Sequence, residues 1–300
     1  MLSPVVLIGI AAGGVVFVGT ILMVFFLLHQ GGSFDRMKQE ALGMPVALGE
    51  MKPQLYDELL ELASQRGPKP LQLEQPLVGE CVRIRNWSTK NDAAIMYSIS
   101  SGSPRNGVYR NIAFDADEMI WRYMDHGPFA SVAEFTSVQC EELADSRHFV
   151  ITDAASHPIG MVSLRNHSPR DLRIEIADLW LAPSHQGSGV LPEIVLLLLQ
   201  HLFSLKYRRV EWRCDGHNIR ARRAAHSLGF TFEGVMRKHR IVKQCNRDTV
   251  SFSVVNSDWP VVEEQLRLKV ASAISKARAS GNAAGEEDAS QPNKTIKKKQ

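Results

Sequence analysis

The segment from Arg173 to Leu205 restricts the possible folds of this chain more than any other. Residues 173–181 have the pattern of a β-strand that ends at Pro183, and an apolar helix runs from about Pro192 to Leu205. Between them lies the loop Gln186-Gly-Ser-Gly189. Such an arrangement brings unpaired backbone amides and the positive end of the helix dipole to one point. The segment therefore predicts a site for a pyrophosphate group.

Two features of this segment limit which class of ligand the loop can bind and where the helix can lie. The loop lacks the lysine of a nucleoside-triphosphate loop and the Gly-x-Gly-x-x-Gly spacing of a dinucleotide fold, so both ligand classes are disfavoured. Glu193, Gln200 and Lys206 confine the apolar run to about 12 residues, too few to cross a bilayer. We expect the helix to pack against a sheet. A glycine loop alone is weak evidence for a site.

The hydrophobic period between Glu80 and about Leu268 switches repeatedly between two and 3.6 residues, which is typical of a mixed α/β domain. Ser131 and Glu134 have the spacing of a capping box and predict the start of a helix. Asn218 opens a further helix, which we expect to end at Gly229. The predicted strands cover residues 81–86, 149–153, 159–164, 173–181, 208–214, 232–242 and 249–255.

The N-terminal segment, residues 1–33, contains no charged side chain, and Val5–Leu28 is almost wholly apolar. This run exceeds the roughly 20 residues that span a bilayer and predicts a single transmembrane anchor. A cleaved signal peptide is disfavoured because a basic start is missing and the apolar run is long; a soluble buried helix is the remaining alternative. Arg36, Lys38 and Lys52 follow the span, so the positive-inside rule predicts that the bulk of the chain is cytosolic.

Three further features concern the flanking segments. Residues 34–79 carry five prolines between polar stretches and predict a juxtamembrane spacer. Residues 269–300 have few large apolar side chains and predict a disordered tail, whose basic end is either solvated or attracted to acidic lipids. Lys297–Gln300 also resembles a dilysine retrieval signal of endoplasmic reticulum proteins. Gly9 and Gly13 have a spacing that favours a homodimer of anchors, although glycine is common in such helices.

Composition disfavours other classes of protein. The net charge is +3 and aromatic residues make up 7% of the chain, so the positive field and stacking surface of a nucleic-acid binder are not evident. The four cysteines stand far apart, which favours reduced thiols over a disulfide framework or a zinc site. The ten histidines include no pair at His-x-x-x-His spacing, so we expect no metal.

Short stretches between about Tyr109 and Trp259 resemble the GNAT superfamily of acetyltransferases. Within it they are most similar to the ribosomal-protein alanine N-acetyltransferases, and their order and spacing cover half of the chain. The matching stretches are Gly127-Pro-Phe129, Ile174-Glu-Ile176, Trp180-Leu-Ala-Pro183, Gln186-Gly-Ser-Gly189, Arg208-Arg-Val-Glu-Trp212, Cys214–Asn218, Arg222-Arg-Ala-Ala225, Leu228-Gly-Phe230, Glu233-Gly234 and Asn246-Arg-Asp-Thr249.

The resemblance implies a GNAT fold and an acetyl-CoA site. Its central mixed, mostly antiparallel sheet would be splayed between the fourth and fifth strands, with helices on its faces. The pantetheine arm of acetyl-CoA would lie in that gap. The residues that the resemblance assigns to acetyl-CoA are Leu179 and Leu181 beside the arm, Gln186, Gly187, Ser188, Gly189 and Val190 at the pyrophosphate, Asn218 on the arm, and Arg222 or Arg223 at the phosphates, unless these arginines form a solvated helix face.

Acetyl transfer needs a proton acceptor for the attacking amine and a donor for the developing oxyanion. The resemblance suggests Glu175 as the acceptor, acting through water; the alternative is that Glu175 only pairs with a basic neighbour. The backbone amide near Leu181 would be the oxyanion donor. Many relatives carry a tyrosine seven residues after the asparagine as the acid for the thiolate, where this chain has Ala225. Leu191 replaces a glycine or alanine and could crowd the phosphates.

These observations predict transfer of an acetyl group from acetyl-CoA to a primary amine, on a protein N-terminus or a small molecule, by direct attack without a covalent enzyme intermediate. The alternative is a degenerate, membrane-tethered module that binds coenzyme A or a protein and catalyses nothing. A third reading makes the domain a membrane-tethered adaptor. The sequence does not identify the amine, the thiolate's proton donor or the membrane.

Overall fold

The structure, a computed structural model, describes residues 71–105, 107–139 and 145–288. Apart from the short segment 232–234, these described residues belong to one compact unit. The predicted anchor, the spacer up to residue 70 and the basic end at 289–300 lie outside the described residues. Within the described ranges, no helix combines the length and the apolar character needed to cross a bilayer.

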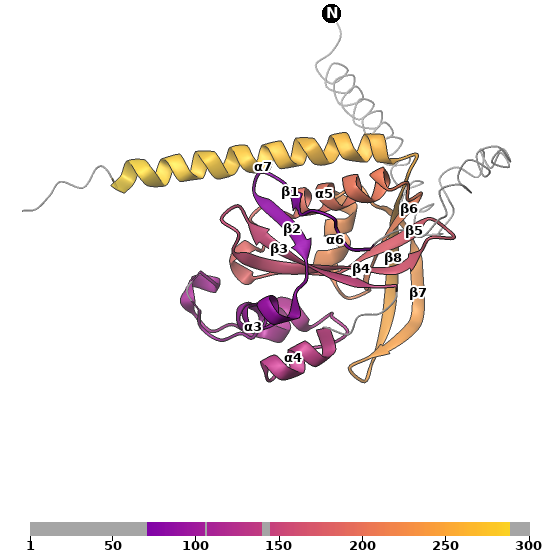
Figure 1. Ribbon diagram of the computed structural model, residues 1–300, viewed down its shortest axis with the longest axis horizontal. Helices are drawn as coiled ribbons and strands as arrows, with labels where there is room; N and C mark the ends of the chain where they lie inside the picture. The colour runs from indigo at the N-terminus through magenta and orange to yellow at the C-terminus, as the bar shows by residue number, and fades with distance from the viewer. Residues whose placement is uncertain (1–70, 106, 140–144, 289–300) are drawn as a thin grey trace, which may run out of the picture. The chain divides into compact units, whose positions relative to one another are not determined.

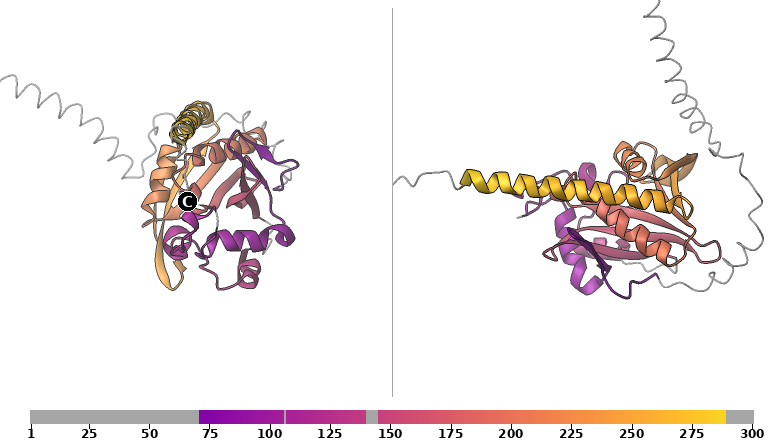
Figure 2. Two further views of the ribbon diagram at one scale, coloured as in Figure 1. Left: turned by 90° about the vertical axis from the view of Figure 1, so that its left-hand side faces the viewer. Right: turned by 90° about the horizontal axis from the view of Figure 1, so that it is seen from above.

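An eight-stranded sheet runs through this unit in the order β1-β2-β3-β4-β5-β6-β8-β7 (Figure 1). The pairs from β1–β2 to β4–β5 and the pair β6–β8 are antiparallel, whereas β5 and β6 are parallel. The prediction of a mixed, mostly antiparallel sheet is therefore confirmed. Helices α5 and α7 lie over one face, and α3 and α4 lie over the other (Figure 2).

The strands are β1 (Leu77–Val78), β2 (Val82–Asn86), β3 (Arg147–Asp153), β4 (Pro158–Ser168), β5 (Arg173–Leu181), β6 (Arg209–Asp215), β7 (Thr231–Val242) and β8 (Cys245–Val255). The helices are α3 (Thr89–Ser100), α4 (Val132–Gln139), α5 (Leu191–Ser204), α6 (Ile219–Ser227) and α7 (Trp259–Asp288), with short turns η2 (Tyr109–Asn111), η3 (Asp117–Trp121) and η4 (Pro183–His185).

Apolar side chains fill both faces of the sheet. On the α5 side, Ile194, Val195 and Leu199 are fully buried, as expected for a core helix rather than a membrane span. On the other side, Trp121 packs edge-on against Phe129 with ring centres 5.0 Å apart. This aromatic cluster fixes η3 and the segment that follows it against β4 and β5.

The predicted boundary between spacer and domain, at residue 79, is wrong. Leu71 and Leu73 are buried, and β1 pairs with β2. Asn86 holds the segment in place, because its side chain accepts from the Leu73 amide at 2.9 Å and donates to the Leu73 carbonyl at 2.7 Å. The prolines of this region suggested a spacer, but an extended segment tolerates proline at the edge of a sheet.

The prediction of a disordered tail is wrong for residues 269–288, which belong to α7. Alanine, lysine, arginine and glutamate dominate this part, and all four favour helix. The helix is nucleated by its first half, where Trp259 stacks on Phe203 with ring centres 5.0 Å apart and Leu266 is fully buried. Extension of a helix that already exists costs little, since nucleation is the unfavourable step.

A buried carboxylate joins the start of α5 to β2. Glu193 is 4% exposed and accepts hydrogen bonds from the amides of Glu80 at 2.5 Å, Cys81 at 2.9 Å and Val82 at 3.1 Å. Three consecutive backbone amides, at the start of β2 and just before it, thus donate to the same carboxylate. This bond set holds the helix that carries the glycine loop at a fixed place on the sheet.

Replacing Glu193 with alanine should lower the free energy of unfolding by about 3 kcal/mol, because three backbone amides lose a charged acceptor. Urea denaturation at neutral pH measures the change. The control is Glu134→Ala, which removes an exposed carboxylate that accepts from the Ala130 amide at 2.7 Å and should cost at most about 1 kcal/mol. Equal losses in the two variants would contradict the assigned role of Glu193.

Candidate active site

The site begins where β5 and β6 separate. Their parallel pairing runs from Arg173↔Arg209 to Ile176↔Trp212 and goes no further. Beyond this point β5 continues to Leu181, while β6 continues to Asp215 paired with β8. The expected splay between two neighbouring strands is therefore present. It lies between β5 and β6, which are the fourth and fifth of the predicted strands because β1 was not predicted.

A β-bulge in β5 accompanies this separation. Ser163 of β4 faces Ala177, but Met161 faces Trp180, so two residues of β5 stand opposite one residue of β4. One of them, Asp178, has the left-handed backbone angle φ = 48°. An extra residue of this kind bends its strand and increases the local twist. The bulge thus turns the end of β5 away from β6.

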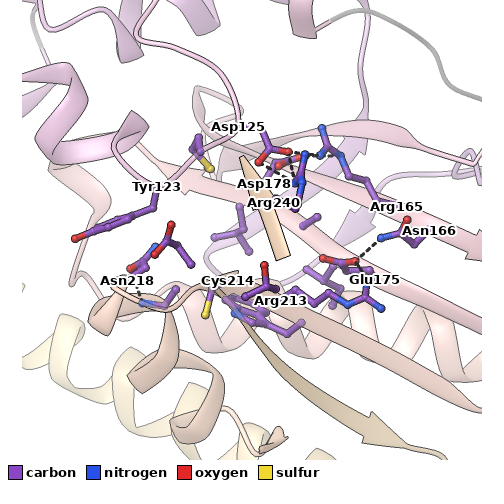
Figure 3. Close-up of a pocket in the computed structure, with 18 of the residues that line it drawn as sticks. Tyr123, Asp125, Arg165, Asn166, Glu175, Asp178, Arg213, Cys214, Asn218 and Arg240 are labelled. Atoms are coloured by element: carbon purple, nitrogen blue, oxygen red, sulfur yellow. Dashed lines mark hydrogen bonds and ion pairs between the residues drawn. The ribbon is translucent and has the colours of Figure 1, made fainter. Parts of the chain in front are cut away.

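A cavity of about 670 Å³ lies at the opening between the two strands (Figure 3). Three residues predicted from the sequence line it, namely Glu175, Leu179 and Asn218. Leu181, the loop 186–190 and Arg222 do not line this cavity. Leu181 is the last residue of β5, the loop follows β5, and Arg222 lies on α6, which follows β6. Leu191 does not line the cavity either, so it does not obstruct this space.

The loop before α5 has the form expected of an anion site. Gly187 and Gly189 have φ angles of 74° and 89°, which favour glycine, and a side chain at Gly187 would meet open space. In the described part of the chain, the amides of Gly187, Gly189 and Val190 show no backbone acceptor. The side chain of Gln186 is engaged elsewhere, since it donates to the carbonyls of Met119 and Leu181 at 2.9 and 3.0 Å.

The open edge of β5 fits an extended ligand. The Ala182 amide donates to Ile159 of β4 at 2.7 Å, and successive amides of a strand point in opposite directions. The Leu181 amide therefore points away from β4, toward the gap. Asn218 caps α6 by accepting from the Ala221 amide at 3.0 Å, which leaves its NH₂ group to donate. These groups fit acetyl-CoA, whose arm needs backbone partners and whose diphosphate needs free amides.

Arg222, which was predicted to contact the coenzyme phosphates, has a partner within the protein. Arg222 donates to the Gly216 carbonyl at 3.2 Å and so supports the turn between β6 and α6. Its predicted contact with the coenzyme phosphates stays a prediction.

Helix α7 packs against the glycine loop, because a side chain placed on Gly189 would lie 3.0 Å from Cβ of Ala273. The loop is thus open at Gly187 and closely packed at Gly189.

Glu175 combines burial with two polar partners. It is 6% exposed, accepts from Asn166 Nδ2 at 2.6 Å and lies 3.6 Å from Arg213 Nη1. Burial raises the pKa of this carboxyl above its ordinary value, and Arg213 and Asn166 offset part of the increase. A carboxylate with a raised pKa is a better proton acceptor near neutral pH. The ion pair with Arg213 fits the alternative that Glu175 only balances a charge.

A cluster of arginines around Asp125 forms another wall of the cavity. Asp125 lies 2.9 Å from Arg240, 2.6 Å from Arg247 and 3.4 Å from Arg165. Burial alone would raise the pKa of Asp125, but the three guanidinium groups outweigh it and hold the pKa below its usual value. Arg165 also pairs with Asp178 at 2.7 Å. Figure 3 shows Asp125, Asp178, Arg165 and Arg240 gathered on one side of the cavity.

Sequence reasoning missed several residues that line the cavity, including Tyr123, Asp125, Asn166, Asp178 and Arg213. Only Asp178 carried a usable signal. Aspartate is rare inside strands and tolerates the left-handed conformation, so its place within residues 173–181 could have indicated the bulge. The others depend on contacts between segments far apart in the chain. Within the described residues, no group of histidine, cysteine and carboxylate side chains is placed to hold a metal ion.

Comparisons with known proteins agree with this geometry. Residues 83–231 match the family model described as "Acetyltransferase (GNAT) domain". "Probable N-acetyltransferase YjcK" of Bacillus subtilis is 28% identical over 119 residues, which are 39% of this chain. The match spans 66% of that relative's length.

Solved structures show the likeness over a larger share of the chain. A GCN5-related N-acetyltransferase from Brucella melitensis has a TM-score of 0.60 and 29% identity, covering 68% of this chain and 88% of that one. A probable acetyltransferase of the GNAT family from Chromobacterium violaceum has a TM-score of 0.55 and 28% identity, covering 65% of this chain and 96% of that one. The family-model match and these structures identify residues 83–231 as a GNAT acetyltransferase domain.

Proposed function

We propose that this protein transfers an acetyl group from acetyl-CoA to a primary amine, on a protein N-terminus or a small molecule. The observation that carries the proposal is the gap between β5 and β6, which opens into a cavity of about 670 Å³ lined by Glu175. Acetyl-CoA supplies the activated thioester carbonyl. The alternative, a degenerate module that binds coenzyme A or a protein and catalyses nothing, is not favoured, because the matching family model and the similar structures are those of acetyltransferases.

Coenzyme binding, deprotonation of the amine and stabilisation of the oxyanion each have a candidate group. The amides of Gly187, Gly189 and Val190 hold the diphosphate, and the NH₂ group of Asn218 binds the arm. Glu175 accepts the proton of the attacking amine through water. The Leu181 amide stabilises the negative charge that develops on the carbonyl oxygen. Since the amine attacks directly, the enzyme forms no covalent intermediate.

The amine substrate is proposed from resemblance rather than from a recognised side-chain pattern. The similarity to ribosomal-protein alanine N-acetyltransferases favours a protein N-terminus, and the polar cavity also suits a small amine. Thiol release from acetyl-CoA, measured with N-terminal peptides and small amines, tests both classes. Turnover with no amine, together with tight coenzyme A binding by calorimetry, would instead support the degenerate module.

We also propose that residues 1–33 anchor the protein in a membrane, with the catalytic domain in the cytosol and the endoplasmic reticulum as a candidate membrane. The long uncharged run at the N-terminus supports this location. The full chain should sediment with membranes after carbonate extraction, and a variant without residues 1–33 should not. Retention of the shortened chain in the pellet would contradict the anchor. The Gly9 and Gly13 spacing keeps a homodimer as a proposal.

Replacing Arg213 with leucine should shift the acid limb of kcat/KM to higher pH. Arg213 lowers the pKa of Glu175, so its removal raises that pKa further. Glu175 must be ionised to accept a proton, and the variant therefore loses activity first as the pH falls and regains it as the pH rises. The pH profile of kcat/KM, with the melting temperature checked for each variant, measures the effect.

Two further variants serve as the negative and positive controls of this test. Arg170→Leu removes an exposed arginine outside the cavity and should leave the acid limb in place. Glu175→Gln should lower kcat at least about 100-fold and abolish the acid limb, as expected for loss of a proton acceptor. An unchanged limb in Arg213→Leu, or full activity in Glu175→Gln, would leave Glu175 with only a structural role.

Replacing Ala273 with leucine should weaken coenzyme A binding about tenfold, or by about 1.4 kcal/mol. Ala273 packs closely on Gly189, so a larger side chain must displace the loop that holds the diphosphate. Calorimetry with coenzyme A measures the affinity. Ala271→Leu is the matched control, because Ala271 is exposed on the same helix. Similar affinities in both variants would show that the contact with α7 does not affect the loop.

A further inference from the structure

The reaction lacks an evident acid for the departing thiolate. Ala225 occupies the position at which many GNAT enzymes carry a tyrosine, and it is fully buried and does not line the cavity. Another donor, from the cavity wall or from water, must therefore serve. The hydroxyl and thiol groups that line the cavity belong to Tyr123, Ser146, Cys214 and Thr249.

Three of these four groups are poorly suited to donate a proton. The Thr249 hydroxyl lies 3.0 Å from Nδ1 of His239 and is engaged there. Burial raises the pKa of the Cys214 thiol to about 11, which makes it a weaker acid than an ordinary thiol. Ser146 has an aliphatic hydroxyl, which is a far weaker acid than a phenol. The phenol of Tyr123 remains.

The segment that leads to Tyr123 is held against the predicted coenzyme groups. Arg220 of α6 donates to the Glu118 carbonyl at 3.1 Å, and Gln186 of the glycine loop donates to the Met119 carbonyl at 2.9 Å. Lys243, between β7 and β8, donates to the Trp121 carbonyl at 2.7 Å. Three separate parts of the site therefore fix the backbone two to five residues before Tyr123.

The cavity separates Tyr123 from the proposed proton acceptor. In Figure 3, Tyr123, Asn218 and Cys214 lie toward one side of the cavity, and Glu175 and Arg213 lie toward the other. Tyr123 is half-buried, and its hydroxyl shows no hydrogen bond to the described residues. A reaction that takes a proton from the nucleophile and gives one to the leaving group needs two such groups on different sides of the carbonyl.

We propose that Tyr123 is the catalytic acid that protonates the departing thiolate, an inference that rests on the proposed acetyltransferase function. The amine lone pair forms the new N–C bond, the C–S bond breaks, and its electron pair stays on sulfur. Sulfur then takes the proton of the Tyr123 hydroxyl. Glu175 takes the proton that the amine nitrogen loses, and exchange with water returns both side chains to their starting states.

The test is the Tyr123→Phe variant of the full chain, with the best amine found for the wild type. We expect kcat to fall by about 100-fold, within the range for loss of general-acid catalysis. The Kd of coenzyme A by calorimetry should stay within about twofold of wild type, since a factor of two is only about 0.4 kcal/mol. Tyr123→His should recover part of the lost kcat, because imidazolium also donates a proton.

Two matched variants complete the experiment. Tyr109→Phe removes a hydroxyl outside the cavity, and His126→Gln removes the imidazole of another residue that lines it and that competes as the proton donor; both should keep kcat near the wild-type value. A kcat of Tyr123→Phe within twofold of wild type, no recovery with histidine, or an equal loss in His126→Gln would overturn the proposal. Absence of turnover in the wild type itself would defeat the proposed function instead, and is recognised before any variant is made.

Discussion

The bulge at Asp178 is the constraint from which the site follows. Parallel strands normally stay paired along their whole length, and a sheet that ran on between β5 and β6 would leave no backbone free for a ligand. The extra residue in β5 changes the register against β4 and ends the pairing after Ile176. Its left-handed backbone is uncommon for a residue with a side chain, and the surrounding strands hold it in place.

The carboxylates on the two sides of the cavity differ in how far arginines compensate their charge. On one side, Asp125 and Asp178 are partly buried beside arginines that compensate their charge. Glu175 has a weaker arrangement, because its partner Arg213 is 3.6 Å away and also binds Glu211 at 2.6 Å. Burial therefore raises the pKa of Glu175, whereas arginines lower that of Asp125. Two carboxylates in one cavity thus suit two tasks, proton transfer and structural support.

The sequence predicted the regular elements well where hydrophobic periodicity was strong. β5 has the predicted bounds, and α5 and α6 differ from prediction by about one residue at each end, which is the usual uncertainty of helix limits. β1 was missed because two residues are too few to show a period. Helix α7 was missed altogether, since no helix was predicted after the strand at 249–255. Its second half is polar and gains stability from the anchored first half.

The site was less predictable than the fold. Glu175, Leu179 and Asn218 line the cavity, and they lie on elements whose patterns are local. Tyr123 and Asp125 follow a short turn with no period, and only the contacts of α6, the glycine loop and the β7–β8 connection place them. Such placement depends on side chains up to 122 residues apart in the chain, for example Lys243 with Trp121, which no local pattern encodes.

The tryptophan pair beneath the site gives the molecule an optical probe of its own. Trp121 and Trp180 pack with ring centres 5.5 Å apart and are 1% and 5% exposed. Trp121 lies two residues before Tyr123, and Trp180 lies next to Leu181 on the open edge of β5. Displacement of either segment changes the surroundings of both indoles, so ultraviolet emission can follow events in the cavity without an attached label.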